Sequence, residues 1–261
     1  MGIMVKINKG TDLIKTKYLM KFKQKTYTGK MYDIKYLVEF NKKSNDILIV
    51  FTACTKKGQK ARYNYIRTLE GIKCNKLFIL DDFGFDGRGA YYLGKNKDFA
   101  IAIDVEKLID DICKEVKAEK EIYIGSSKGA YAALYFGMGR KNTSIVAGAP
   151  QYRLGNYLYL PSHRNILNYI MGDESKESIN KLNILMENRL KNNENNGNSI
   201  YLHYSNEEET FKSDIEPLIE ALNNLNIKKK YDIHRYKNHS DLTLYFPKYI
   251  KDTLKKECNI L

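Results

Sequence analysis

The fold is decided by residues 121–138, EIYIGSSKGAYAALYFGM. Its apolar residues 122–124 predict a short buried strand, and the Ala-, Leu- and aromatic-rich residues after the turn predict a helix. The turn itself, GSSKG at residues 125–129, fits the pattern G-x-S-x-G with Ser127 at its centre. Glycines let the backbone pass closely at such a turn, and the helix N-terminus places N–H groups beside the serine hydroxyl. We therefore expect Ser127 to be a nucleophile; the alternative is a glycine-rich turn without chemistry.

The rest of the chain alternates between strand-like and helix-like segments. Apolar runs and alternating patterns predict strands at residues 3–5, 31–40, 46–53, 77–80, 144–148, 199–204 and 231–236. Helical spacing predicts helices at residues 63–69, 105–116, 214–225 and 242–256. The first two strands are expected to be antiparallel. The alternation predicts the α/β class, with one domain over residues 1–261 built on a doubly wound, mostly parallel sheet.

The amino-acid composition changes after the strand predicted at 144–148. The following segment is rich in proline, tyrosine and histidine, and a polar helix-like segment at 176–190 and an asparagine-rich loop at 192–198 come next. The apolar content of this stretch is too small for a core of its own. We expect residues from about 150 to 198 to form an insertion that covers the active edge as a lid.

Composition limits the classes of partner. The formal net charge is +13, but the lysines are spread along the chain rather than gathered with aromatic residues, so we expect solvated surface and no nucleic-acid partner. No apolar run approaches the ~18 residues of a membrane span, and the N-terminus lacks a secretory signal, which favours a cytoplasmic protein. The four scattered cysteines are expected to be reduced.

A histidine follows the last predicted strand. In open α/β sheets function collects at the carboxyl ends of the strands, and the α/β-hydrolase order places an acid after a late strand and a histidine after the last. His239 fills the second position and is the expected base; the alternative is a surface histidine at a helix N-terminus. His203 and His234 lie within strands and are expected to pack there, whereas contact between His163 and substrate is left open.

The candidate acid lies in residues 207–209, three glutamates after the strand at 199–204. Three consecutive glutamates usually form a solvated turn, so only one is expected to face His239, hold its tautomer and stabilise the imidazolium. Glu208 is the first choice and Glu207 the second. Asp241 is too close in sequence to His239 for this role and is expected to cap the following helix.

An oxyanion hole needs two backbone donors. One is expected from Lys128, directly after the nucleophile, and the other from Thr52, Ala53 or Cys54 after the strand at 46–53. Substrate contacts are expected from polar and aromatic side chains near this edge, with packing as the alternative for the tyrosines: Arg88, Tyr91, Tyr92, Gln151 and Tyr152. The chain has no H-E-x-x-H, P-loop or dinucleotide fingerprint, so no metal and no nucleotide cofactor is expected.

Three runs of sequence resemble a known family: LFILDDFG followed by GRGAYYLGKN, IGSSKGAYAALYFGM, and IVAGAPQYRLGNYL. Together they resemble the α/β-hydrolase-like acetyltransferase component of the accessory Sec secretion system and the related group of capsular polysaccharide biosynthesis. The resemblance covers about residues 45–250. It implies a Ser-Glu-His enzyme that transfers acetyl groups to sugar hydroxyls during export, with Ser127, a glutamate of 207–209 and His239 in these roles, and an export or capsule-synthesis partner.

Two kinds of function are consistent with these features. The first is a serine ester hydrolase or O-acyltransferase that acts on glycans or glycoconjugates through an acyl-enzyme. The second is a non-catalytic module that binds an anionic glycan or an assembly partner, which the basic charge would suit. The presence of both Ser127 and His239 favours the enzyme. Hydrolysis and transfer differ in whether the lid excludes water.

Overall fold

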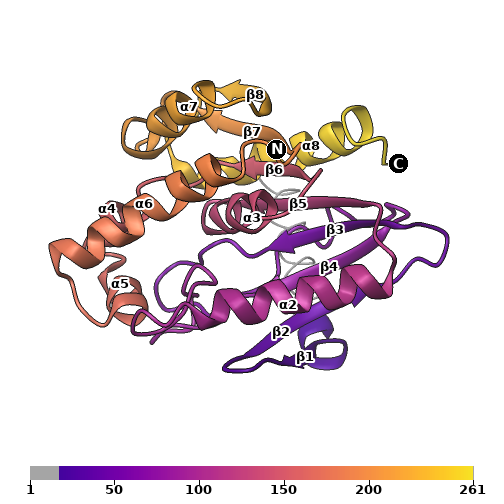
Figure 1. The fold of residues 1–261 in the computed structure, drawn as a ribbon, viewed down its shortest axis with the longest axis horizontal. Helices are drawn as coiled ribbons and strands as arrows, with labels where there is room; N and C mark the ends of the chain where they lie inside the picture. Colours follow the sequence, from indigo (N-terminus) through magenta and orange to yellow (C-terminus); the bar gives the residue numbers. More distant parts are fainter. Residues whose placement is uncertain (1–17, 261) are drawn as a thin grey trace, which may run out of the picture.

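The computed structural model describes residues 18–260, which form an eight-stranded sheet with the order β1-β2-β4-β3-β5-β6-β7-β8 (Figure 1). The strands are β1 (Lys25–Thr28), β2 (Asp33–Glu39), β3 (Asp46–Phe51), β4 (Asn75–Leu80), β5 (Lys120–Ser126), β6 (Ser144–Gly148), β7 (Ser199–Ser205) and β8 (Lys228–His234). The pairs β1–β2 and β2–β4 are antiparallel, and the other five are parallel. The predicted α/β class and mostly parallel sheet are confirmed. The strand expected at residues 3–5 lies outside the described residues.

Turns connect β3 to β4; helices connect the remaining parallel strands, and the last helix follows β8. They are α2 (Ala100–Glu115), α3 (Lys128–Met138), α4 (Leu154–Leu158), α5 (Arg164–Met171), α6 (Lys176–Asn192), α7 (Glu216–Asn223) and α8 (Leu242–Lys256). A π-helical turn, Phe211–Ile215, leads into α7, and a 3-10 turn, His239–Asp241, leads into α8. Among residues 18–260, none of the helices combines the length and the hydropathy that a membrane-spanning helix needs.

The helices cover the sheet in two layers. Figure 1 shows α2, α3 and α6 side by side on one face, and Arg189 of α6 joins the other two: its guanidinium lies 4.0 Å from the ring centroid of Tyr135 in α3 and donates to Glu106 in α2 at 3.1 Å. Helix α8 covers the opposite face. It packs closely against β6, since a Cβ atom on Gly148 would lie 2.8 Å from the ring of Phe246. The apolar central strands are thereby buried on both sides, as their continuous apolar sequences require.

Helix α6 belongs to this layered core. Its apolar side Leu182, Met186 and Leu190 is buried, and it supplies the crossover that two parallel neighbours, β6 and β7, require. The segment that carries α4 and α5 lies before it. The lid role expected for residues from about 150 to 198 remains a prediction, and α6 within this range packs into the core.

One sequence-based expectation of local structure is wrong, and one helix begins and ends at other residues than expected. Residues 63–69 form turns instead of a helix, and Tyr65 has a positive φ of 63° that a right-handed helix does not allow. The helix expected at 214–225 is divided into the π-helical turn and the shorter α7. The strand β1 was not predicted, because its four residues are mostly exposed and carry no apolar run.

Candidate active site

Ser127 occupies a sharp turn between β5 and α3. Its φ of 51° and ψ of −122° are unusual for a residue with a side chain, and the backbone N–H of Ser127 donates to the carbonyl of Gly148 at 2.8 Å. The backbone passes so close to both glycines of the motif that neither position has room for a side chain. A Cβ atom on Gly125 would lie 2.1 Å from the carbonyl oxygen of Gly129, and one on Gly129 would lie 2.7 Å from that of Phe51. The turn thus has the geometry of a nucleophile elbow.

The hydroxyl of Ser127 has a buried neighbour in the loop after β6. Nε2 of Gln151 donates to Ser127 Oγ at 3.4 Å, a long hydrogen bond, and Oε1 of Gln151 accepts from the Tyr91 hydroxyl at 3.2 Å. Burial raises the pKa of Tyr91 far above its ordinary value, so the phenol keeps its proton and remains a donor. Two of the predicted substrate-contact residues, Gln151 and Tyr91, therefore lie in a hydrogen-bonded chain that reaches the Ser127 hydroxyl.

Glu208 and His239 are brought together from the loops after β7 and β8. The distance from Glu208 Oε2 to His239 Nδ1 is 3.2 Å, and the Glu208 side chain is completely buried, whereas Glu207 and Glu209 are exposed. The carboxylate favours the tautomer with the proton on Nδ1, which leaves Nε2 with a free electron pair. Nε2 of His239 is buried and forms no hydrogen bond with any described residue, Ser127 included.

The backbone donors near Ser127 differ in their availability. The Thr52 N–H donates to the Tyr92 hydroxyl at 2.7 Å, and the Ala53 N–H donates to Asn64 Oδ1 at 2.8 Å. Two of the three amides proposed from the sequence for the second oxyanion contact, those of Thr52 and Ala53, are therefore already engaged. Within residues 18–260, the N–H groups of Cys54 and Lys128 have no hydrogen-bond partner. This pair is the better candidate for the oxyanion hole.

The side chain of Lys128 anchors the elbow. It has no exposed surface, and its ammonium donates to Asp81 Oδ2 at 2.8 Å, to the Asp81 carbonyl at 3.2 Å and to the Arg88 carbonyl at 3.0 Å. The Asp81 carboxylate also accepts from the backbone N–H groups of Ala90 and Tyr92. This pair was not predicted from the sequence, although the lysine lies inside the elbow and the aspartate directly follows the apolar strand β4.

Arg88 and Tyr92 are occupied by contacts within the protein. Nε of the buried Arg88 donates to Asp86 at 2.8 Å, and one Nη donates to the Ser162 carbonyl at 3.2 Å. Arg88 thus attaches the segment before α5 to the loop after β4. The Tyr92 hydroxyl is buried between Thr52 and the Ile79 carbonyl. Because these polar groups already have partners within the protein, the structure does not support the contact with substrate expected for either residue.

Tyr152 and His163 belong to the segment between β6 and α6. Tyr152 is buried, and its backbone N–H donates to Asp214 in the π-helical turn at 2.8 Å. His163 stacks on Tyr157 with ring centroids 4.6 Å apart. Burial, with a smaller effect of the positive charge on Arg88, lowers the pKa of His163 to about 4. A neutral imidazole, whose buried Nδ1 has no hydrogen-bond partner among the described residues, therefore lies within electrostatic range of His239.

No protein-family model matches this chain, and no curated protein sequence matches it significantly. Solved structures share its fold. The capsule O-acetyltransferase of Neisseria meningitidis serogroup A superposes with a TM-score of 0.74 at 20% identity, covering 89% of this chain and 94% of that chain. A mutant of the same enzyme, solved in complex with CoA, superposes with a TM-score of 0.72 at 20% identity, over 88% of this chain and 94% of that chain.

Two further solved structures, of other kinds of protein, share the fold. A chain of the glycosylation-associated Gap123 complex from Streptococcus agalactiae has a TM-score of 0.72 at 16% identity, covering 90% of this chain and 47% of that chain. The fluorophosphonate-binding serine hydrolase F of Staphylococcus aureus has a TM-score of 0.65 at 11% identity, covering 89% and 96%. At these identities the likeness concerns the fold. The chain has an α/β-hydrolase fold and resembles a capsule O-acetyltransferase and serine hydrolases in structure.

Proposed function

We propose that this protein is a serine-dependent O-acyltransferase or ester hydrolase that works through a Ser127–His239–Glu208 triad. The observation that carries the proposal is the buried contact between Glu208 and Nδ1 of His239, which leaves the other ring nitrogen free to accept a proton. The strained elbow that presents Ser127 supports it, because such strain persists where the surrounding structure enforces it for function.

The residues define a complete acyl-transfer cycle. Ser127 Oγ attacks the acyl carbonyl while Nε2 of His239 takes the hydroxyl proton, and Glu208 stabilises the resulting imidazolium. The N–H groups of Lys128 and Cys54 stabilise the negative carbonyl oxygen of the tetrahedral intermediate. The bond to the leaving group then breaks, and the leaving group takes the proton from His239. An acceptor hydroxyl or water attacks the acyl-enzyme by the same steps in reverse, and Ser127 regains its proton.

The proposed substrates are an acetyl donor and a glycan hydroxyl. The structural resemblance to a capsule O-acetyltransferase, one form of which was solved with CoA, makes an acetyl thioester the first donor to test. A formal net charge of +13 favours encounter with a polyanionic donor or acceptor. The likeness to a chain of a glycosylation-associated complex supports an export or capsule-synthesis partner as part of the same proposal.

The proposal is tested by trapping the acyl-enzyme. The protein is mixed with acetyl-CoA or with an activated acetyl ester, quenched in acid, and examined by intact mass spectrometry and peptide mapping. We expect one added acetyl group on Ser127, no adduct in Ser127→Ala, and a normal adduct in Ser126→Ala. An adduct on another residue, or none with either donor in a folded protein, would contradict the triad. Release of acetate with and without added oligosaccharide then separates hydrolysis from transfer.

A further inference from the structure

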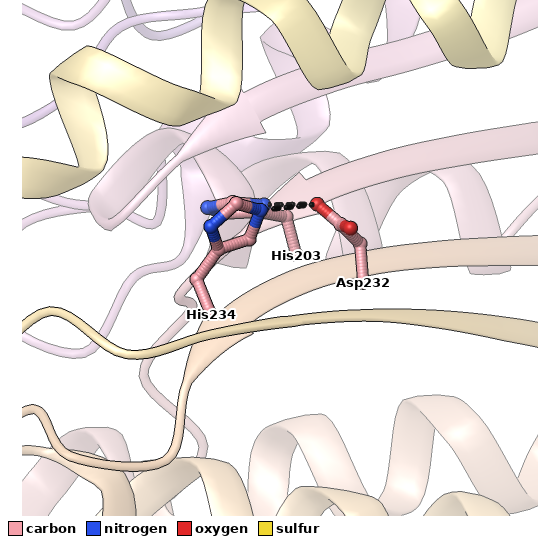
Figure 2. Close-up of side chains that lie close together, drawn as sticks. All are labelled: His203, Asp232 and His234. Atoms are coloured by element: carbon pink, nitrogen blue, oxygen red, sulfur yellow. Dashed lines mark hydrogen bonds and ion pairs between the residues drawn. The ribbon is translucent and has the colours of Figure 1, made fainter.

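Three metal-ligating side chains gather on the sheet face that α8 covers. His203 of β7 is paired in register with Asp232 of β8, and His234 lies two residues further along β8. Residues two apart in a strand point to the same face, and paired residues on neighbouring strands lie side by side. The strand register therefore places His203, Asp232 and His234 together, as Figure 2 shows. From the sequence both histidines were expected to pack within their strands, since local sequence does not reveal a register that pairs residues far apart in the chain.

The three side chains already converge on one carboxylate oxygen. Nδ1 of His203 lies 2.6 Å from Asp232 Oδ2, and Nε2 of His234 lies 3.3 Å from the same oxygen. One ligand atom from each residue lies within 4.8 Å of the others. Ligand atoms about 2.0–2.2 Å from a tetrahedral zinc ion are about 3.3 Å apart. Small side-chain rotations, which open the His203–Asp232 contact and draw the two imidazoles together, would therefore reach this spacing.

The surroundings are apolar on one side and open on the other. His203 is fully buried, with its ring centroid 5.8 Å from that of Phe246 and 5.5 Å from that of Tyr249 in α8. The side chains of Asp232 and His234 are 34% and 35% exposed. An ion held by three protein ligands would thus keep at least one position for water on the exposed side. This arrangement is the usual one for a zinc ion with three protein ligands.

The charge of the cluster suits a divalent ion. Two neutral imidazoles and one carboxylate give the site a charge of −1. When the ion binds, the hydrogen bond between Asp232 and His203 is replaced by bonds from both residues to the ion. Two lysines oppose a cation here: Lys248 on α8, whose pKa is raised by its hydrogen bond to Asp252 at 2.7 Å and slightly by Asp232, and Lys230 of β8, which pairs with Glu257 at 2.6 Å. Because Asp252 and Glu257 neutralise much of these ammonium charges, the two lysines weaken the site without cancelling the attraction for a double charge.

We infer that His203, Asp232 and His234 form a binding site for a divalent transition-metal ion, with zinc as the first candidate. Two nitrogen ligands and a single carboxylate match zinc and do not provide the oxygen-rich shell that calcium or magnesium requires. The site is separate from the proposed triad, but the same two strands, β7 and β8, lead into the loops that carry Glu208 and His239. A bound ion would therefore clamp together the strands that position the acid and the base.

The test compares substitutions inside the cluster with substitutions of the two histidines that lie outside it, His163 and His239. Zinc is titrated into metal-free protein in competition with a chromophoric chelator, and the melting temperature is recorded with and without zinc. We expect one zinc ion per chain, a rise in melting temperature, and a loss of affinity of about 100-fold or more in His234→Ala and Asp232→Asn, since even the loss of an outer-shell partner costs 10–100-fold. Both mutated residues are partly exposed, so the variants are expected to fold.

The matched controls are His239→Ala and His163→Phe, which remove the two histidines outside the cluster and should leave zinc affinity unchanged. Cobalt added in place of zinc should give a visible spectrum without a thiolate charge-transfer band, because no cysteine is among the ligands. No zinc binding to folded wild-type protein would overturn the inference. Zinc binding that persists in His234→Ala and disappears in His239→Ala would also overturn it, because the ion would then belong to the triad.

Discussion

The ammonium of Lys128 is buried 2.8 Å from the carboxylate of Asp81, and neither side chain has any exposed surface. Lys128 directly follows the proposed nucleophile, and its backbone N–H is a proposed oxyanion donor. Its side chain joins the start of α3 to the loop after β4 through three hydrogen bonds. This ion pair therefore holds in place the backbone on which the proposed chemistry depends.

Breaking this pair should be costly. In Lys128→Met the Asp81 carboxylate keeps its backbone donors but loses its buried counter-charge. We expect the free energy of unfolding to fall by about 3–5 kcal/mol, the cost of removing one partner of a buried pair. Urea denaturation measures the change. The double variant Lys128→Met/Asp81→Asn should recover a large part of the loss, and a double variant less stable than the single one would show that the pair is not the cause.

The Glu208–His239 contact predicts a difference between two adjacent glutamates. Glu208→Gln keeps the shape of the acid but removes its charge and can place an N–H against His239 Nδ1, which favours the wrong tautomer. We expect kcat for acyl transfer or ester hydrolysis to fall by about 10⁴-fold, as in a serine protease that carries the equivalent change. Glu207→Gln, whose side chain is exposed, is the matched control and should retain normal kcat. Equal effects of the two substitutions would remove Glu208 from the triad.

His163 should make the protein sensitive to acid. Its pKa is about 4 in the folded protein, compared with about 6.5 in an unfolded chain, so the unfolded state binds more protons between these values. The contribution of a neutral His163 to stability is therefore complete above about pH 6.5 and declines as the pH falls towards 4. His163→Phe keeps an aromatic ring against Tyr157 but cannot titrate.

Melting temperatures recorded between about pH 7 and pH 4.5 test this prediction. The melting temperature of His163→Phe relative to wild type should rise as the pH is lowered, because only the wild type gains a proton on unfolding at this position. Other titrating groups contribute equally to both proteins and cancel in the difference. Parallel pH profiles would show that His163 already carries its ordinary pKa in the folded protein.

Much of the fold could be predicted because its central strands are buried on both sides. Continuous apolar runs marked β3, β4 and β6, and the G-x-S-x-G turn marked the passage from β5 to α3. The loop positions of Glu208 and His239 followed from the strand order, because acids and bases of this fold occupy the carboxyl ends of late strands. A candidate triad could therefore be named from local sequence and strand order alone.

Other features depend on partners that local sequence does not reveal. The amides of Thr52 and Ala53 are engaged because Tyr92 and Asn64 reach them from loops distant in the chain. The side chain of Asn64 and the positive φ of Tyr65 also belong to the turns that replace the expected helix at 63–69. The His203 cluster likewise depends on the register between β7 and β8, which is a tertiary property.

The central claim is that Ser127 is an activated nucleophile, and a fluorophosphonate probe tests it most directly. Ser126→Ala is the matched control, since the Ser126 hydroxyl accepts a hydrogen bond from Tyr65 at 2.5 Å and has no proposed catalytic role. We predict labelling of wild type and Ser126→Ala, none of Ser127→Ala, and much slower labelling of His239→Ala. Labelling that persists in Ser127→Ala, or a folded wild-type protein that remains unlabelled, would contradict the account.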